Sequence, residues 1–253
     1  MVEIFREVKR VLRPDGTVWL NLGDSYNANY RGGGLDNASV KQASNKGTID
    51  FMATKKNVVG LKPKDLVGIP WRVAFALQAD GWYLRSDIIW HKPNPMPESV
   101  TDRPTKAHEY IFLLSRSANY KYDADAIKEP VTKSSIQRLS QNIDKQKGSD
   151  RVPGKTNGPI KAAGNIEYRN KRSVWTQTTK PYKEAHFAVF PDELIIPCIK
   201  AGSEKGGIVL DPFVGSGTTM KVAQRLGRNA VGIELNTDYC NLIMKRFANY
   251  ELF

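Results

Sequence analysis

The chain contains few of the residues from which metal sites are built. Its 253 residues include two cysteines, Cys198 and Cys240, and three histidines. The two cysteines form no metal-type pair, so we expect no structural zinc and no other metal site. Sparse cysteine also favours a reducing, cytoplasmic location.

Long apolar runs and acidic residues are scarce as well. No run approaches the roughly 20 apolar residues that cross a bilayer, and the N-terminus has no signal-peptide pattern. Acidic residues number 26 against 38 lysines and arginines, which gives a net charge of +12. This excess favours a polyanionic partner. The length fits one large α/β domain, or one domain with an insertion.

The basic residues are concentrated in one segment, residues 131–183. It holds twelve lysines and arginines against three acidic residues. A solvated linker is one interpretation. Its length argues against a passive linker, because structureless loops beyond about 15 residues are usually functional or disordered. Tyr168 and Trp175 among the basic residues suit contact with bases and phosphates.

A glycine turn between an apolar run and a helical pattern is the most informative motif. Ile208-Val209-Leu210 leads into Asp211-Pro212-Phe213-Val214-Gly215-Ser216-Gly217-Thr218-Thr219, and a second apolar run ends at Glu234. Glycines let the backbone turn tightly and approach a ligand. The helix that follows presents unpaired N–H groups, and an acid at the next strand end can accept ribose hydroxyls. The order strand, turn, helix, strand and acid predicts a nucleoside-cofactor site.

Two common phosphate-binding motifs are excluded at this turn. A P-loop requires Gly-Lys-Ser/Thr, and a dinucleotide fingerprint requires a small residue where this chain has Met220. The motif, together with Gly232-Ile233-Glu234-Leu235, instead resembles the S-adenosylmethionine site of the amino-methylating DNA methyltransferases. Further resemblance extends over Phe5–Gly16, Leu22–Asp24, Ile88–Pro95, Arg103–Tyr110 and Ala185–Pro191.

The order of these motifs resembles the circularly permuted β class of the family. The resemblance implies an α/β fold, a Rossmann-like, mostly parallel sheet with helices on both faces. It implies a target-base half at residues 1–130, a recognition insertion at 131–183 and a cofactor-binding half at 184–253. The implied activity is methyl transfer from S-adenosylmethionine to an exocyclic amine of a flipped base in double-stranded DNA. N4-cytosine is favoured over N6-adenine on overall resemblance, and an RNA or small-molecule substrate is a further alternative.

The resemblance also assigns candidate residues to each role. Asp24 is a candidate catalytic-site carboxylate, although a strand-end Asp is as readily a capping residue. The expected cofactor-binding residues are His186, Phe190, Pro191, Asp211, Phe213, Gly215, Ser216, Gly217, Thr218, Thr219 and Glu234. The expected DNA-binding residues are Arg31, Lys55, Lys56, Arg151, Lys155, Arg169, Lys171 and Arg172. A bacterial or phage origin and a cognate restriction endonuclease are what the family implies.

The family's catalytic loop, Ser/Asp/Asn-Pro-Pro-aromatic, has no counterpart here, since the chain contains no Pro-Pro pair. The family places that loop just before the helix at Ile4. We therefore expect an N-terminally incomplete fragment that is inactive alone, with a non-catalytic pseudoenzyme as the alternative. A fragment of this kind would leave a gap between the strands ending at Leu22 and Leu210, exposing backbone groups and apolar side chains.

Overall fold

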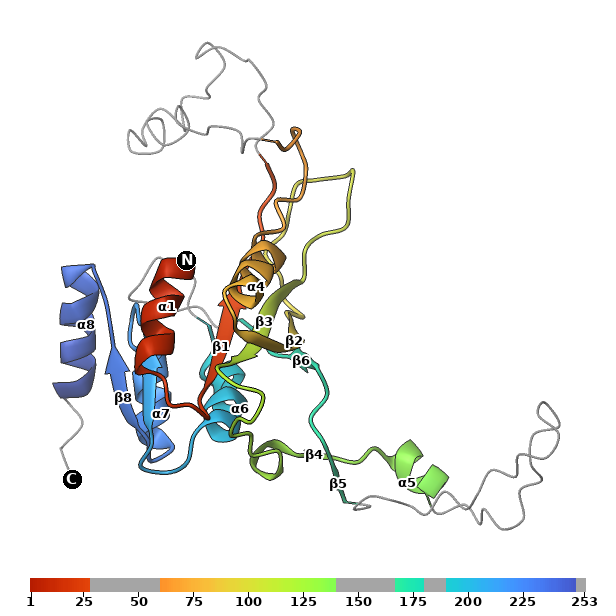
Figure 1. The fold of residues 1–253 in the computed structure, drawn as a ribbon. Helices are drawn as coiled ribbons and strands as arrows, with labels where there is room; N and C mark the ends of the chain where they lie inside the picture. The colour runs from red at the N-terminus through yellow and green to blue at the C-terminus, as the bar shows by residue number, and fades with distance from the viewer. Residues whose placement is uncertain (28–59, 140–166, 180–189, 249–253) are drawn as a thin grey trace.

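The computed structural model describes residues 1–27, 60–139, 167–179 and 190–248. Helices and strands are interspersed along the chain (Figure 1), and they alternate regularly over residues 192–248. The N-terminal part comprises α1 (Val2–Val11), β1 (Thr17–Leu22), α4 (Ile69–Ala79), β2 (Tyr83–His91), β3 (His108–Ser115), a short 3-10 helix (Asp125–Ile127) and β4 (Glu129–Pro130). The remainder comprises α5 (Lys133–Leu139), β5 (Tyr168–Arg169), β6 (Val174–Thr176), α6 (Asp192–Gly202), β7 (Ile208–Asp211), α7 (Thr218–Arg225), β8 (Asn229–Gly232) and α8 (Thr237–Ala248).

The main sheet has four strands in the order β1-β3-β2-β6. β3 runs antiparallel to β1 and to β2, whereas β6 runs parallel to β2. The described part of this sheet is therefore mixed, which corrects the expected mostly parallel arrangement. The sequence pattern concealed this because apolar runs such as Tyr110–Leu114 identify a buried strand without giving its direction.

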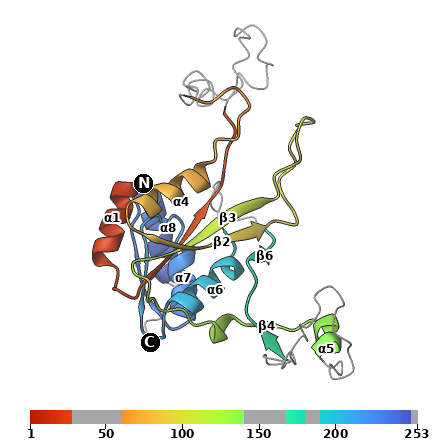
Figure 2. The ribbon, with the colours of Figure 1, turned by 45° about the vertical axis from the view of Figure 1, so that its right-hand side comes forward.

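α1 and α4 cover one face of this sheet (Figure 2). Phe5 of α1 and Leu77 of α4 are buried there against Phe112 and Leu114 of β3. Successive strand residues point to opposite faces, so Ile111, the residue before Phe112, belongs to the core on the other side. The alternation of large apolar residues along β3 thus supplies two cores from one strand.

α6 covers the opposite face and also reaches the second sheet. Leu194 and Cys198 of α6 pack with Trp90 and Trp175 of the main sheet. Ile199, the residue after Cys198, faces the other way and packs with Val222 of α7 and with other residues of the β7–β8 unit. The same helix therefore holds both parts of the molecule together.

The second sheet consists of β7 and β8, paired in parallel through α7. Among the described residues, β1 has β3 as its one sheet neighbour and β7 has β8. Within the described ranges both strands are therefore edges of their sheets. The gap expected between the strands that end at Leu22 and Leu210 stays a prediction. The apolar side chains nearby are exposed as well, and Ile208 is 70% accessible.

β6 lies inside the basic segment 131–183 and is nevertheless a strand of the main sheet. β5, also inside that segment, pairs with β4, which precedes it. Strands this short leave no periodic signal in the sequence. No helix in the described ranges is long and apolar enough to cross a membrane.

We expect the purified 253-residue chain to unfold at low temperature and to aggregate on heating, because two strand edges and several apolar side chains are exposed. Ile208→Lys places a charge on the β7 edge and should raise the onset temperature of aggregation with little change in melting temperature. Differential scanning calorimetry with light scattering measures both.

Leu194→Ala is the contrasting variant, because Leu194 is only 1% exposed in the core beneath α6. It should lower the unfolding free energy by about 2–5 kcal/mol. A cooperative, high-temperature melt of the unmodified chain would show that the open edges do not limit stability.

Candidate cofactor and DNA site

The glycine turn connects the end of β7 to the start of α7. Gly215 and Gly217 have φ values of +52° and +83°, in the left-handed region that glycine adopts most easily. A Cβ on Gly217 would lie 3.1 Å from Cγ1 of Ile243 in α8. The second glycine is therefore required both by its backbone conformation and by close packing.

Asp211 braces this turn from within. One carboxylate oxygen accepts the Phe213 N–H at 2.9 Å, and the other accepts the Thr219 hydroxyl at 2.5 Å. Both oxygens are thus engaged by the turn and by the first helical residues after it. In this structure Asp211 shapes the turn, an effect that would support the expected cofactor role indirectly.

Glu234 connects the end of β8 to the same turn. Its two carboxylate oxygens accept the Gly215 N–H at 2.9 Å and the Asn236 N–H at 2.8 Å. Each oxygen retains a second lone pair, because a carboxylate has about four acceptor positions. Glu234 can therefore brace the turn and still accept a ligand hydroxyl.

Gly232 is a site residue absent from the sequence prediction. A Cβ there would lie 2.8 Å from Sδ of Met220 and 2.9 Å from both methyl carbons of Val214. β8 can approach the turn only because this position carries no side chain. The glycine next to Ile233-Glu234 was the available signal, since a glycine in a strand often marks a close approach.

The first turn of α7 has the polar groups that an external ligand would need. The Thr218 hydroxyl is buried without a hydrogen-bond partner among the described residues. A buried hydroxyl without a partner costs about 1–3 kcal/mol, which a ligand would recover. Ser216 beside it is buried, whereas the Phe213 ring is 54% exposed at the mouth of the turn. These features fit a small ligand with polar and apolar parts.

Phe190 and Pro191 lie at the start of α6, beside α7. Pro191 is the N-cap residue of α6, and Phe190 packs against the core beneath that helix. Asp192 bonds to Lys221 at 3.0 Å and to Arg225 at 3.2 Å, which fixes the α6 start against α7. The structure thus brings these two predicted residues to the α7 side of the turn, while His186 lies outside the described residues.

Asp24 follows β1 and caps a helix. Its Oδ1 accepts the backbone N–H groups of Ser25 at 2.9 Å and of Ile69 at 3.0 Å. Ile69 is the first residue of α4, where N–H groups lack partners within the helix. The geometry supports the capping interpretation of Asp24, and its catalytic role stays a prediction.

Three of the predicted DNA-binding residues are described. Arg169 and Arg172 both bond to the Glu129 carboxylate at 2.9 Å, and the Lys171 ammonium lies 5.0 Å from the centre of the Trp175 ring. Burial raises the pKa of Glu129, but the hydrogen bonds from Arg172 and Arg169 outweigh it, so this pKa lies below its usual value. Arg31, Lys55, Lys56, Arg151 and Lys155 lie outside the described residues.

The aromatic residues of the basic segment have different environments. Tyr168 is exposed, whereas Trp175 is 5% accessible in β6 and packs with α6. The expectation that Trp175 contacts DNA bases is therefore wrong. Its indole N–H donates to the Arg172 carbonyl at 2.7 Å, an arrangement of the core.

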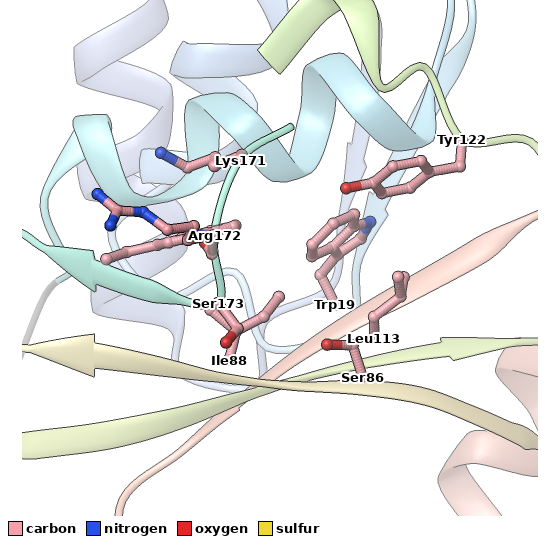
Figure 3. A pocket seen from close by; sticks show the side chains of 9 residues that line it. Trp19, Ser86, Ile88, Leu113, Tyr122, Lys171, Arg172 and Ser173 are labelled. Carbon is pink, nitrogen blue, oxygen red and sulfur yellow. The ribbon is translucent and has the colours of Figure 1, made fainter. Parts of the chain in front are cut away.

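A small cavity lies on the α6 face of the main sheet (Figure 3). Its volume is about 70 Å³, and its walls include Trp19, Ile88, Leu113 and Tyr122. Lys171 and Arg172 extend away from Trp19 in this view. Ligand pockets usually measure roughly 300–1,000 Å³, so this cavity is too small for a nucleoside. The described residues contain no group of three or more histidine, cysteine or acidic side chains placed to hold a metal.

A parallel β–α–β unit with a braced glycine turn and an acid at the second strand end defines a nucleoside-cofactor protein of the α/β class. The chain matches the N6/N4 family described as DNA methylase over residues 1–245, and it belongs to that family. The predicted class, an S-adenosylmethionine-dependent DNA methyltransferase, is thereby confirmed.

Curated relatives agree with this assignment. The chain is 48% identical over 246 residues to the type II methyltransferase M.SmaI of Serratia marcescens, covering 97% of this chain and 72% of the relative. It is 46% identical over 247 residues to the type II methyltransferase M.Cfr9I of Citrobacter freundii, covering 97% and 69%.

Solved structures share the fold at low identity. The cytosine-N4-specific PvuII DNA methyltransferase has a TM-score of 0.62 at 17% identity, covering 100% of this chain and 72% of that one. A Thermus thermophilus protein assigned as a DNA modification methylase, complexed with S-adenosyl-L-methionine, has a TM-score of 0.57 at 22% identity, covering 98% and 74%.

Gly217→Ala should abolish measurable S-adenosylmethionine binding for two reasons. Alanine is strained at the positive φ of this position, and its methyl group would lie too close to Ile243 in α8. Isothermal titration calorimetry gives the dissociation constant. Gly227→Ala is the matched control, since Gly227 has a φ of +74° and open space around it at the far end of α7. Equal loss of binding in both variants would mean that general destabilisation, and not the turn, is responsible.

Proposed function

We propose that this protein methylates the exocyclic amine of a base flipped out of double-stranded DNA, with N4-cytosine favoured over N6-adenine. The observation that carries the proposal is the braced turn, where Asp211 and Glu234 hold the backbone. Beside it lies the Thr218 hydroxyl, which has no hydrogen-bond partner in the described part of the chain. The preference for cytosine rests on overall resemblance to the family.

The β7–α7–β8 unit is the Rossmann-like part that would hold S-adenosylmethionine. The group supplies an electrophilic methyl on a sulfonium centre. Glu234 accepts ribose hydroxyls, the α7 N-terminus and Thr218 hydroxyl bind polar atoms, and Phe213 and Phe190 supply apolar contact. Asp211, Gly215, Ser216, Gly217, Thr219 and Pro191 set the shape of this site, with His186 as a further expected contact.

The target half supplies the wall opposite the cofactor. Asp24 fixes the end of β1 to the start of α4, so it positions the edge that the flipped base would approach. Its second oxygen could orient the target amine. Residues 1–130 would form this half, and residues 184–253 the cofactor half.

Residues 131–183 would carry sequence recognition, with Arg169, Lys171 and Arg172 in the described part of this segment. Glu129 pairs with both arginines. The Arg172 side chain is nevertheless 67% exposed, so it would be accessible to a phosphate. Arg151 and Lys155 in the same segment, and Arg31, Lys55 and Lys56 in the segment after β1, would add contacts. A cytoplasmic bacterial or phage setting with a cognate restriction endonuclease fits the type II relatives.

Host DNA from cells that express the protein should accumulate N4-methylcytosine, measured by mass spectrometry of the digested nucleosides. Glu234→Gln should lower the accumulation about ten-fold or more, because an amide replaces one charged acceptor. Asp238→Asn, an exposed change in α8, is the matched control.

The alternatives give different products. N6-methyladenine would correct the base preference. Unmodified DNA from cells in which the protein binds S-adenosylmethionine would support the non-catalytic alternative instead.

A further inference from the structure

Two segments lie side by side beyond the carboxyl ends of β1 and β2 (Figures 1 and 2). Tyr26, just after β1, forms a bridge with Leu66, just before α4. The connection between β2 and β3 contacts both of them. The Arg103 guanidinium lies 3.8 Å from the centre of the Tyr26 ring, and Lys64 bonds to Asp102 at 2.6 Å. The bridged stretches around Tyr26 and Leu66 and the β2–β3 connection therefore form a single wall.

The charges of this wall are paired, with one exception. We define the edge cluster as three ion pairs and one further lysine: Lys64–Asp102, Arg103–Glu98, Lys92–Glu109 and Lys106. The three pairs are locally neutral. The Lys106 ammonium has no hydrogen-bond partner within the described residues and is hidden from solvent. The net positive charge of the edge cluster therefore resides on Lys106.

A buried ammonium without a partner is unfavourable, because the lost hydration is not replaced. The backbone at this position is fixed, since the Ala107 carbonyl accepts the Lys92 N–H at 2.8 Å. The side chain has four rotatable bonds and belongs to a residue that is only half-buried. It can swing outward to any anion that reaches the wall, which would relieve this cost.

We propose that Lys106 binds a backbone phosphate of the DNA substrate at this wall. A single ammonium matches a singly charged phosphodiester. The paired cations beside it are held by their own carboxylates and contribute less. The inference rests on duplex DNA being the substrate, and it adds a contact outside the basic segment 131–183.

The test is Lys106→Met, which keeps the length of the side chain and removes the charge. Binding of a mixed-sequence DNA duplex is followed by fluorescence anisotropy at several salt concentrations. Losing one phosphate contact should reduce the slope of log K against log salt by about 0.9 and raise the Kd several-fold. Lys106→Arg should retain wild-type affinity.

Lys64→Met is the matched control, because it removes one charge from the same wall at a lysine already paired with Asp102. Its salt slope should change little. An unchanged slope in Lys106→Met, or equal slopes in both variants, would overturn the proposal. Two further results would overturn the proposal: Lys106→Met fails to fold, or its melting temperature falls while its Kd for DNA stays the same. Either result would mean that the Lys106 ammonium stabilises the protein by bonding to an acceptor within it. Absence of duplex binding by the wild type would instead overturn the proposed substrate.

Discussion

The packing of α6 against two different cores is the constraint on which the arrangement of the molecule depends. Among the described residues, β1 and β7 share no hydrogen bonds, so no continuous sheet joins the β7–β8 unit to the main sheet. Leu194 and Cys198 bury one side of α6 on the main sheet, and Ile199 buries another against α7. The ion pairs of Asp192 then fix the start of this helix against α7. A methyl donor and its target must be aligned within about 0.5 Å, and in the proposed function this helix would provide much of that alignment.

The carboxylates at the glycine turn brace the protein and, in the proposed function, would still leave acceptor positions for a ligand. Asp211 and Glu234 each accept two hydrogen bonds from the protein. Those bonds hold the turn in a conformation that only glycine tolerates at positions 215 and 217. A turn fixed in advance loses less conformational entropy on binding. Glu234 retains lone pairs for a ligand, so bracing and recognition do not compete.

The cofactor half could be predicted closely from the sequence, because its signals are local. The strand before Asp211, the glycine turn and the acid at 234 lie within about two dozen residues, and each has its own physical reason. Apolar runs also predict strands at 17–22, 83–90 and 110–115, and the structure has them at Thr17–Leu22, Tyr83–His91 and His108–Ser115. Their directions were not predictable, because the antiparallel insertion of β3 between β1 and β2 is a long-range property. β6 was missed for the same reason, and the burial of Trp175 followed from it.

Net charge alone misidentifies which basic residues are available to DNA. The segment 131–183 has a large excess of cations, yet Arg169 and Arg172 share Glu129, and Lys171 lies over a core tryptophan. The β2–β3 connection has a much smaller excess, yet it holds an ammonium with no partner among the described residues. Counterion release depends on cations that actually neutralise phosphates. A cation held by a nearby carboxylate must first give up that partner, so its net gain on binding is smaller. Whether a cation is already paired with a carboxylate therefore decides its contribution to DNA binding more than its position in a basic stretch of sequence does. Only the folded structure reveals this pairing.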